Sequence, residues 1–316
     1  MPILERPFAA SAAARLLQAG SRVGAKRAAR AAAARLPEYR GRPRELLVPT
    51  LLGPARGDGY RPIAATRGVG DEDGGPPPVH LNLHGGGYVL GLMAGDDPLC
   101  RVRSAEAGVV VLNVGYALAP QHPFPRAVDQ VFEIVRWVAA NGRAQGWDGT
   151  RVTVGGQSAG AGLAAAAARL AFERGGPPVM LQVLHYPPLD LTPPCGTKPS
   201  PVARPALRPW MCAVFEGAYA PDPAARADRL VSPAGPADTA DLTGIAPALV
   251  IAAEHDILRD EARRYADRLD RVGALVEYRE VPGADHGYDR TDDAQARDTY
   301  KIIAGHVRRA GRPAAR

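Results

Sequence analysis

The sequence has only three cysteines in 316 residues, Cys100, Cys195 and Cys212. Cysteines that are so few and so far apart exclude a disulfide framework and a cysteine-based zinc site. We therefore expect a protein of a reducing compartment and predict a cytoplasmic location. No metal is expected, because His80 and His84 lack the helical spacing that makes such a pair zinc ligands. No cofactor is expected either.

Uninterrupted apolar runs are also missing. The longest apolar stretch without charge, residues 107–125, is broken by Asn113, Gln121, His122 and three prolines. Such a stretch is too polar for the core of a bilayer. We predict a chain without a membrane span.

Acidic residues are scarce at the start of the chain, where Glu5 is the only one before Glu38. Residues 1–47 hold ten Lys and Arg against three Glu, and residues 304–316 hold four Arg and no acid. A nucleic-acid-binding protein is expected to carry its basic residues on the folded body, so charge at the two ends predicts no nucleic-acid partner. An Arg-rich start is also typical of a transit peptide, but apolar residues at helical spacing between 13 and 23 favour an ordinary amphipathic helix.

The chain does contain enough apolar material for a large core, with 46% hydrophobic and 23% charged residues. Short β-rich runs alternate with helical patterns, which is typical of a parallel sheet with helices on its faces. Eight strands are predicted at residues 46–52, 60–66, 79–83, 109–114, 151–154, 180–185, 248–253 and 276–281. Helices are predicted at residues 127–140, 158–174, 259–272 and 292–309. We predict an α/β protein with an eight-stranded, mostly parallel central sheet flanked by helices.

One long segment does not fit this alternation. The sixth and seventh strands are separated by roughly sixty residues, and loops of that length are uncommon in compact domains unless they are lids or binding loops. Residues 208–219 predict one short helix inside it. We interpret residues 188–232 as a cap over the strand ends, and residues 46–187 and 233–316 as the body. The residues expected to line a pocket under the cap are Tyr88, Trp210, Met211 and Phe215.

Gly156-Gln157-Ser158-Ala159-Gly160 follows a predicted strand and opens an alanine-rich helical run. This is a G-x-S-x-G motif at a strand-to-helix turn, where the flanking positions must be small and the serine hydroxyl points outward. The helix N-terminus adds partial positive charge where an oxyanion would form. We predict that Ser158 is a nucleophile, with a plain tight turn as the alternative.

A glycine-rich loop, His84-Gly85-Gly86-Gly87, follows another predicted strand. Glycines leave N–H groups unencumbered, and a tetrahedral intermediate needs such donors around its oxygen. We predict an oxyanion hole formed by Gly85, Gly86 and Gly87 together with the N–H group of Ala159, and we expect His84 to anchor the loop. A phosphate-binding loop is the alternative, but neither G-K-[ST] nor G-x-G-x-x-G accompanies it.

A serine hydroxyl needs a base to remove its proton, and the base needs a carboxylate to orient it. Asp256 and His286 each follow a predicted strand, and they complete the hydrolase order of serine, acid and histidine. Both lie at the carboxyl ends of strands, where open α/β sheets place their ligands. The competing candidates are His255 for the base, and Glu254 and Asp260 for the acid.

From about residue 45 onward, these motifs together resemble the bacterial hormone-sensitive-lipase-like esterases of the α/β-hydrolase superfamily. Residues 116–125, Y-A-L-A-P-Q-H-P-F-P, are similar to the family's Y-R-L-A-P-E-x-P-F-P segment, and residues 256–261, D-I-L-R-D-E, to its D-P-L-R-D-E. The chain departs from the family where charged residues are usual, at Ala117, Gln121 and Gln157. We hypothesise that the family's charged residues at these three positions form one ionic network beside the site. On this hypothesis, all three are neutral in this chain because losing one member alone would leave a buried charge unpaired.

The resemblance implies the α/β-hydrolase fold and hydrolysis of small to medium acyl esters through an acyl-serine. Ser158 would be the nucleophile, His286 the base and Asp256 the acid that orients it. The resemblance also implies that a helical arm, residues 1–45, forms part of the cap. The alternatives are an amidase, a lactonase or an acyl-transferring or cyclising enzyme with the same machinery, and a non-catalytic ligand-binding relative. The expected partner is a small-molecule ester, with a homodimer as a candidate assembly.

Overall fold

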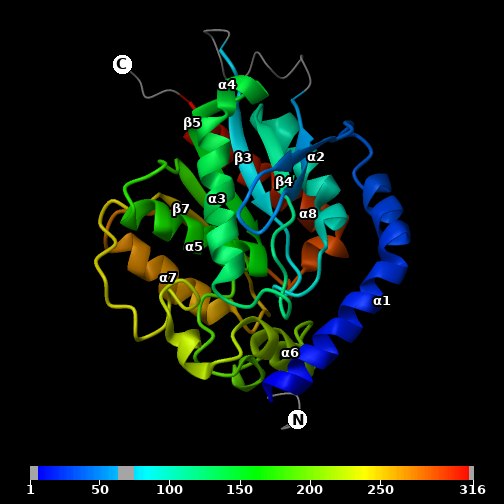
Figure 1. Cartoon of the computed structure of the whole chain (residues 1–316), viewed down its shortest axis with the longest axis vertical. Coiled ribbons are helices and arrows are strands. Elements are labelled where there is room, and N and C mark those ends of the chain that lie inside the picture. Colours follow the sequence, from blue (N-terminus) through cyan, green and yellow to red (C-terminus); the bar gives the residue numbers. More distant parts are fainter. Residues whose placement is uncertain (1–5, 63–74, 313–316) are drawn as a thin grey trace.

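The computed structural model describes residues 6–62 and 75–312 and is built around one eight-stranded sheet (Figure 1). The strands are β1 (Arg44–Val48), β2 (Ala55–Tyr60), β3 (Pro78–Leu83), β4 (Val110–Val114), β5 (Asp148–Gln157), β6 (Leu181–His185), β7 (Ala248–Ala253) and β8 (Leu275–Val281). Their order in the sheet is β1-β2-β4-β3-β5-β6-β7-β8. β2 is antiparallel to both β1 and β4, and all other neighbours are parallel. The prediction of an eight-stranded, mostly parallel sheet is confirmed.

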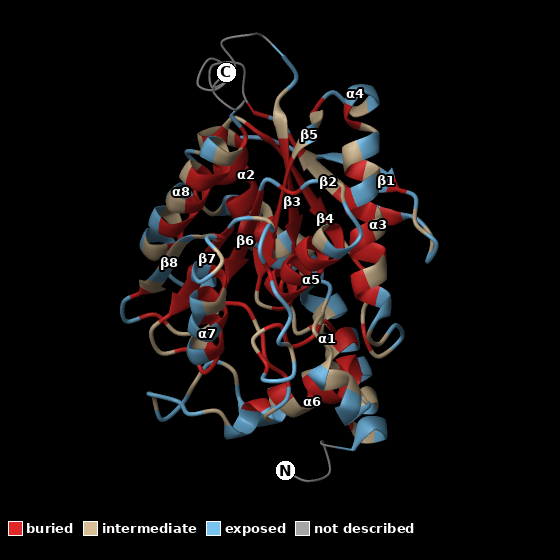
Figure 2. Ribbon diagram, turned by 90° about the vertical axis from the view of Figure 1, so that its left-hand side faces the viewer, coloured by how far each residue is buried: buried red, intermediate tan, exposed pale blue. Residues whose placement is uncertain are grey.

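Helices cover both faces of the sheet. The helices of the described residues are α1 (Pro7–Ala34), α2 (Asp97–Ala107), α3 (Arg126–Ala140), α4 (Gly142–Gln145), α5 (Ala159–Glu173), α6 (Pro209–Tyr219), α7 (Arg259–Asp270) and α8 (Asp293–Ala310). Side chains of α3, α5 and α7 share one hydrophobic core with the sheet, and those of α2 and α8 share another. The central strands β3, β4, β6 and β7 are almost entirely buried (Figure 2), as expected where helices cover both faces of a parallel sheet.

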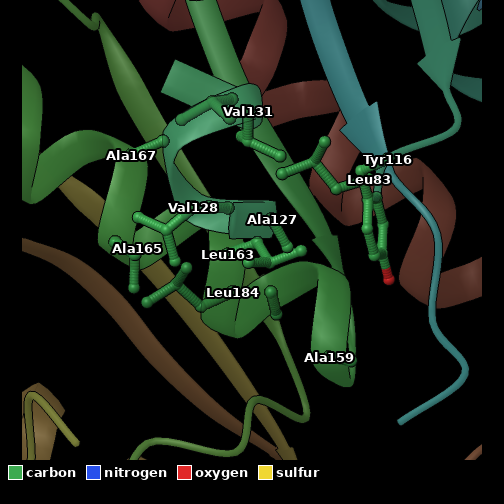
Figure 3. Packing of buried hydrophobic residues seen from close by; sticks show 14 of the residues in the cluster. Leu83, Tyr116, Ala127, Val128, Val131, Ala159, Leu163, Ala165, Ala167 and Leu184 are labelled. Carbon is green, nitrogen blue, oxygen red and sulfur yellow. The ribbon is translucent and has the colours of Figure 1, made fainter. Parts of the chain in front are cut away.

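Alanine allows α5 to lie close to the sheet. Residues 164–168 of this helix are all alanine and all buried. Figure 3 shows the residues of α5, among them Leu163, in one cluster with Val128 and Val131 of α3 and Leu184 of β6. This packing holds the first turn of α5, and the residue before it, against the strand ends.

In the first third of the chain one predicted strand was misplaced and one helix was not predicted. The strand expected at residues 60–66 is β2, which ends at Tyr60, and residues 63–66 lie outside the described residues. Its sequence, A-R-G-D-G-Y, has little strand propensity, so pairing with two neighbours imposes the conformation. Helix α2 was not predicted, because Arg101 and Arg103 lie on its buried side and break the apolar period.

The long insertion and the N-terminal helix lie beside each other. Within residues 188–232 the structure has α6 and two short 3₁₀ helices, Cys195–Thr197 and Pro223–Ala227. Helix α1 packs against α6 (Figure 1). The buried Gln18 of α1 donates hydrogen bonds of 2.9 Å to the carbonyl oxygens of Val89 and Ala119, which fix α1 to the body. No helix in the described part of the chain combines the length and apolarity needed to cross a bilayer.

Candidate active site

Ser158 stands at the sharp turn between β5 and α5, with φ 51° and ψ −125°. A positive φ is strained for a residue with a side chain. Two residues before and two residues after Ser158, only glycine fits. A Cβ on Gly156 would lie 2.3 Å from the Leu83 carbonyl oxygen, and a Cβ on Gly160 would lie 1.9 Å from the same oxygen. The G-x-S-x-G spacing therefore follows from crowding against the end of β3.

The structure brings Ser158, His286 and Asp256 together, and we call these three residues the triad. His286 Nε2 lies 2.9 Å from Ser158 Oγ, and His286 Nδ1 lies 2.7 Å from Asp256 Oδ2. Asp256 is buried, and its Oδ1 accepts a hydrogen bond of 3.0 Å from the Leu258 N–H group. A histidine held in this way presents the lone pair of Nε2 to the serine hydroxyl, which is the geometry needed to remove its proton.

The two competing carboxylates, Glu254 and Asp260, have partners other than His286. Glu254 Oε2 accepts a hydrogen bond of 2.7 Å from the Gly283 N–H group. Asp260 forms a salt bridge with Arg259 on α7. Among the described residues the ring of His255 forms no hydrogen bond. Neither carboxylate contacts the histidine of the triad.

Tyr186 contacts the triad although no motif in the sequence marks it. Its ring packs edge-on against His286, with 4.7 Å between ring centroids. Its hydroxyl donates a hydrogen bond of 2.7 Å to Asp289 Oδ1, and the Tyr300 hydroxyl donates one of 2.7 Å to Oδ2 of the same carboxylate. A phenol whose hydroxyl is held in this way limits rotation of the imidazole. The only signal for it in the sequence is its place directly after a strand.

The glycine loop after β3 runs beside Ser158. A Cβ on Gly85 would lie 3.5 Å from Ser158 Cβ. Gly86 and Gly87 have φ values of 126° and 60°, in the region that favours glycine. Across residues 6–62 and 75–312, the N–H groups of the four predicted donors, Gly85, Gly86, Gly87 and Ala159, donate no hydrogen bond to the rest of the chain. Free N–H groups beside a nucleophile suit a developing oxyanion.

His84 is buried at the start of this loop. Its Nδ1 lies 2.7 Å from the Gly85 carbonyl oxygen, and its ring stacks on Tyr116 at 4.3 Å between centroids. The Tyr116 hydroxyl in turn donates a hydrogen bond of 2.7 Å to the His84 carbonyl oxygen. Burial lowers the pKa of His84 to about 4, so its imidazole is neutral near pH 7 and Nδ1–H donates to Gly85. These contacts support the predicted anchoring role.

A small cavity of about 50 Å³ opens beside Ser158. Two of the predicted pocket residues, Tyr88 and Phe215, line it. Trp210 and Met211 do not line this cavity, because they lie in the first turn of α6, where Trp210 is 40% exposed. The walls that no motif predicted are formed by Pro188, Leu191, Cys195, Lys198, Leu207, Cys212, Glu216 and Leu258.

Two charged side chains of the insertion lie in the cavity wall. Lys198 pairs with Glu261 of α7, and the two side chains are only 7% and 2% exposed. Glu216 accepts a hydrogen bond of 3.0 Å from the Cys195 N–H group, and burial raises the pKa of Glu216 to about 7. Because each group has a partner, these contacts tie the insertion together and to α7. In the described ranges, no group of three or more His, Cys, Asp or Glu side chains is placed to hold a metal ion.

The neutral positions 117, 121 and 157 contact different partners. Gln121 Nε2 donates a hydrogen bond of 2.8 Å to Gln18 Oε1 on α1. The Ala117 N–H group donates one of 2.6 Å to Gln130 Oε1. Gln157 Oε1 is buried without a hydrogen-bond partner among the described residues. The replacement of one charged network as a unit stays a hypothesis.

The sheet order and the triad define the class of the protein as an α/β hydrolase. A sequence profile described as "alpha/beta hydrolase fold" matches residues 80–290, which is more than half of the chain. The chain belongs to this family and, within it, to the hormone-sensitive-lipase-like esterases, so the predicted family is confirmed.

Named relatives agree with this assignment. Carboxylesterase NlhH of Mycobacterium tuberculosis is 37% identical over 213 residues, which are 67% of this chain and 66% of that protein. Ethyl acetate hydrolase of Pseudomonas putida is 35% identical over 217 residues, 66% of this chain and 65% of that protein. The solved esterase of Pyrobaculum calidifontis superposes with a TM-score of 0.79 at 30% identity, covering 94% of this chain and 92% of its own. The chain spans slightly less than two thirds of the length of these curated relatives.

Proposed function

We propose that this chain is a serine carboxylesterase that hydrolyses esters of short acyl groups through an acyl-serine. The observation that carries the proposal is the hydrogen-bonded series from Asp256 through His286 Nε2 to Ser158 Oγ, at 2.7 and 2.9 Å. The names of the relatives, a carboxylesterase, an ethyl acetate hydrolase and an esterase, support it.

Acylation begins when Ser158 Oγ attacks the ester carbonyl carbon while His286 Nε2 accepts the hydroxyl proton. The carbonyl oxygen becomes an oxyanion, and the N–H groups of Gly85, Gly86, Gly87 and Ala159 are the donors proposed to stabilise it. The imidazolium, held by the Asp256 carboxylate, then gives its proton to the leaving alkoxide. The alcohol departs, and the acyl group stays on Ser158.

Deacylation repeats these steps with water in place of the serine. His286 takes a proton from water, and the hydroxide attacks the acyl carbon. The collapse of the second intermediate returns the proton to Ser158 Oγ and releases the carboxylic acid. Amines or other alcohols that replace water would make the chain an acyl transferase, and analysis of the products separates the two outcomes.

The size of the cavity supports a short acyl group. Pockets for drug-sized ligands measure roughly 300–1,000 Å³, whereas the cavity beside Ser158 measures about 50 Å³. Tyr88 and Phe215 close two of its sides.

The assignment of residues 1–45 and 188–232 to one cap belongs to the same proposal, supported by the packing of α1 against α6. A cytoplasmic location and a homodimer also stay proposals.

The direct test is hydrolysis of p-nitrophenyl acetate by Ser158→Ala against the matched control Ser200→Ala, an exposed serine of the insertion. Ser158→Ala should lower kcat by at least about ten-thousandfold, while Ser200→Ala should match the wild type. Both variants should keep the wild-type circular dichroism. Wild-type turnover in folded Ser158→Ala would contradict the proposal, and an inactive wild type would favour the ligand-binding alternative.

A further inference from the structure

Helix α1 has two sides with different surroundings. Ala10, Ala14 and Gln18 are buried against the rest of the protein and are spaced four residues apart. Phe8 and Leu16 each lie two residues from a buried position, which is roughly 200° around a helix of 3.6 residues per turn. The side that carries them therefore points away from the protein, and much of α1 is exposed (Figure 2).

Three large apolar side chains form a row on this outer side. Phe8 is 87% exposed, Leu16 74% and Val23 90%. Spacings of eight and seven residues are close to two helical turns, so the three side chains lie on the same side of the helix. Single exposed apolar residues need no explanation, but apolar residues gathered on one face mark a site of contact with a protein or a membrane.

Cations share this side of α1. The exposed basic residues are Arg15, Arg22, Lys26, Arg27 and Arg30. Spacings of seven, four and four residues place Arg15, Arg22, Lys26 and Arg30 on one side of the helix. None of the five basic residues forms an ion pair with the described residues, and no acidic residue occurs between positions 6 and 37.

We propose that the outer face of α1, defined by Phe8, Leu16, Val23 and these five cations, binds the surface of an anionic lipid membrane. Helices of this kind lie in the plane of the interface with their apolar side chains at the acyl boundary. Clustered Lys and Arg are attracted to anionic headgroups. The cations begin at Arg15 and continue to Arg30, so positive charge complementary to such a surface accompanies the apolar row from Leu16 onward.

Other occupants fit this face less well. A nucleic acid would use the cations but would leave the apolar row in water. The same face of a second copy would bring ten cations together, and like charges at short range repel. The proposal goes beyond the esterase activity and does not depend on it. It also implies that the membrane-binding helix lies near the active site, because α1 packs on α6 and Phe215 of α6 lines the cavity beside Ser158.

The test is sedimentation of the whole chain with vesicles of phosphatidylcholine alone and of phosphatidylcholine with an equal amount of phosphatidylglycerol. We expect binding to the anionic vesicles only, weakened in 0.5 M salt, where the Debye length falls to about 4 Å. Each cation near such a surface strengthens binding by roughly fivefold. Arg15→Gln/Arg22→Gln/Lys26→Gln should therefore weaken it by about a hundredfold, and Leu16→Ser/Val23→Ser should weaken it by at least about tenfold.

The matched control removes three exposed arginines from another face, as Arg126→Gln/Arg136→Gln/Arg143→Gln. It should bind within about twofold of the wild type, and all variants should keep the wild-type thermal unfolding by circular dichroism. Equal binding to both kinds of vesicle, no binding, or an equal loss in the control would overturn the proposal. A wild-type dimer that becomes a monomer in Leu16→Ser/Val23→Ser, without vesicle binding, would assign the face to a second copy instead.

Discussion

A Cβ on Gly87 would lie 2.3 Å from the ring of Phe215, so the glycine loop and α6 meet without room for a methyl group. Gly87 also has φ 60°, which favours glycine. Gly87→Ala should therefore displace the loop whose N–H groups are the proposed oxyanion donors. We expect kcat/KM for p-nitrophenyl acetate to fall by about a hundredfold, a loss typical of one oxyanion donor.

Phe215→Ala removes the clash and serves as the partner in a double-mutant cycle. Gly87→Ala/Phe215→Ala should recover at least tenfold of the activity that Gly87→Ala loses, since contacting residues couple. Losses that simply add, or a fully active Gly87→Ala, would show that the contact does not control the loop.

Acyl chain length provides a second prediction. The cavity of about 50 Å³ has room for a short chain only. Wild-type kcat/KM for p-nitrophenyl esters should be highest at acetate to butanoate and should fall by more than tenfold at octanoate. Phe215→Ala enlarges the cavity and should shift the preference to longer chains, while Trp210→Ala, outside the cavity, should leave it unchanged. A preference for octanoate in the wild type would contradict the size argument.

The buried pair Lys198–Glu261 should be important for stability. Lys198→Met leaves a carboxylate that is 2% exposed without its cation, and breaking such pairs costs about 3–5 kcal/mol. Burial raises the pKa of Glu261, so proton uptake relieves part of the cost, and the loss should be smaller at pH 5 than at pH 8. Urea unfolding measures both values.

An exposed pair is the control for this prediction. Arg297 and Glu38 are 2.7 Å apart, but their side chains are 35% and 44% exposed. Arg297→Met should therefore change the free energy of unfolding far less than Lys198→Met does. Equal effects of the two substitutions would mean that the Lys198–Glu261 pair is screened by water.

His84 should make stability depend on pH. Its folded pKa is lowered to about 4 by burial, whereas an unfolded histidine titrates near 6.5. Below pH 6.5 the histidine is protonated in the unfolded state but not in the folded state. The contribution of His84 to the free energy of unfolding is therefore complete above pH 6.5 and is lost as the pH falls toward 4. The difference in unfolding free energy between wild type and His84→Gln should shrink by about 1.4 kcal/mol per pH unit in that window. A difference that stays constant from pH 7 to pH 4.5 would mean that His84 is not held neutral.

The parts of the fold that follow from local chemistry were predictable from the sequence. G-x-S-x-G indicated the turn at Ser158 because Gly156 and Gly160 touch the end of β3, and no other residue fits there. The helices at α3, α5, α7 and α8 were predicted to within about two residues, since each buries an apolar stripe.

The remainder depends on contacts between distant segments. Arg103 is fully buried in α2, where it donates to Asn82 Oδ1, so an apolar-period argument misses the helix. β2 is a strand because β1 and β4 pair with it. The cavity walls come from loops such as the one with Leu191 and Lys198, which carry no motif. Tyr186 contacts His286 only after the sheet has formed.

The most direct test of the central claim is covalent labelling with a fluorophosphonate, followed by intact-mass and peptide analysis. If His286 activates Ser158, one adduct should form per chain, on Ser158, and His286→Gln should slow its formation by at least about a thousandfold. No adduct on the folded wild type, or an adduct on another residue that persists in Ser158→Ala, would contradict the account.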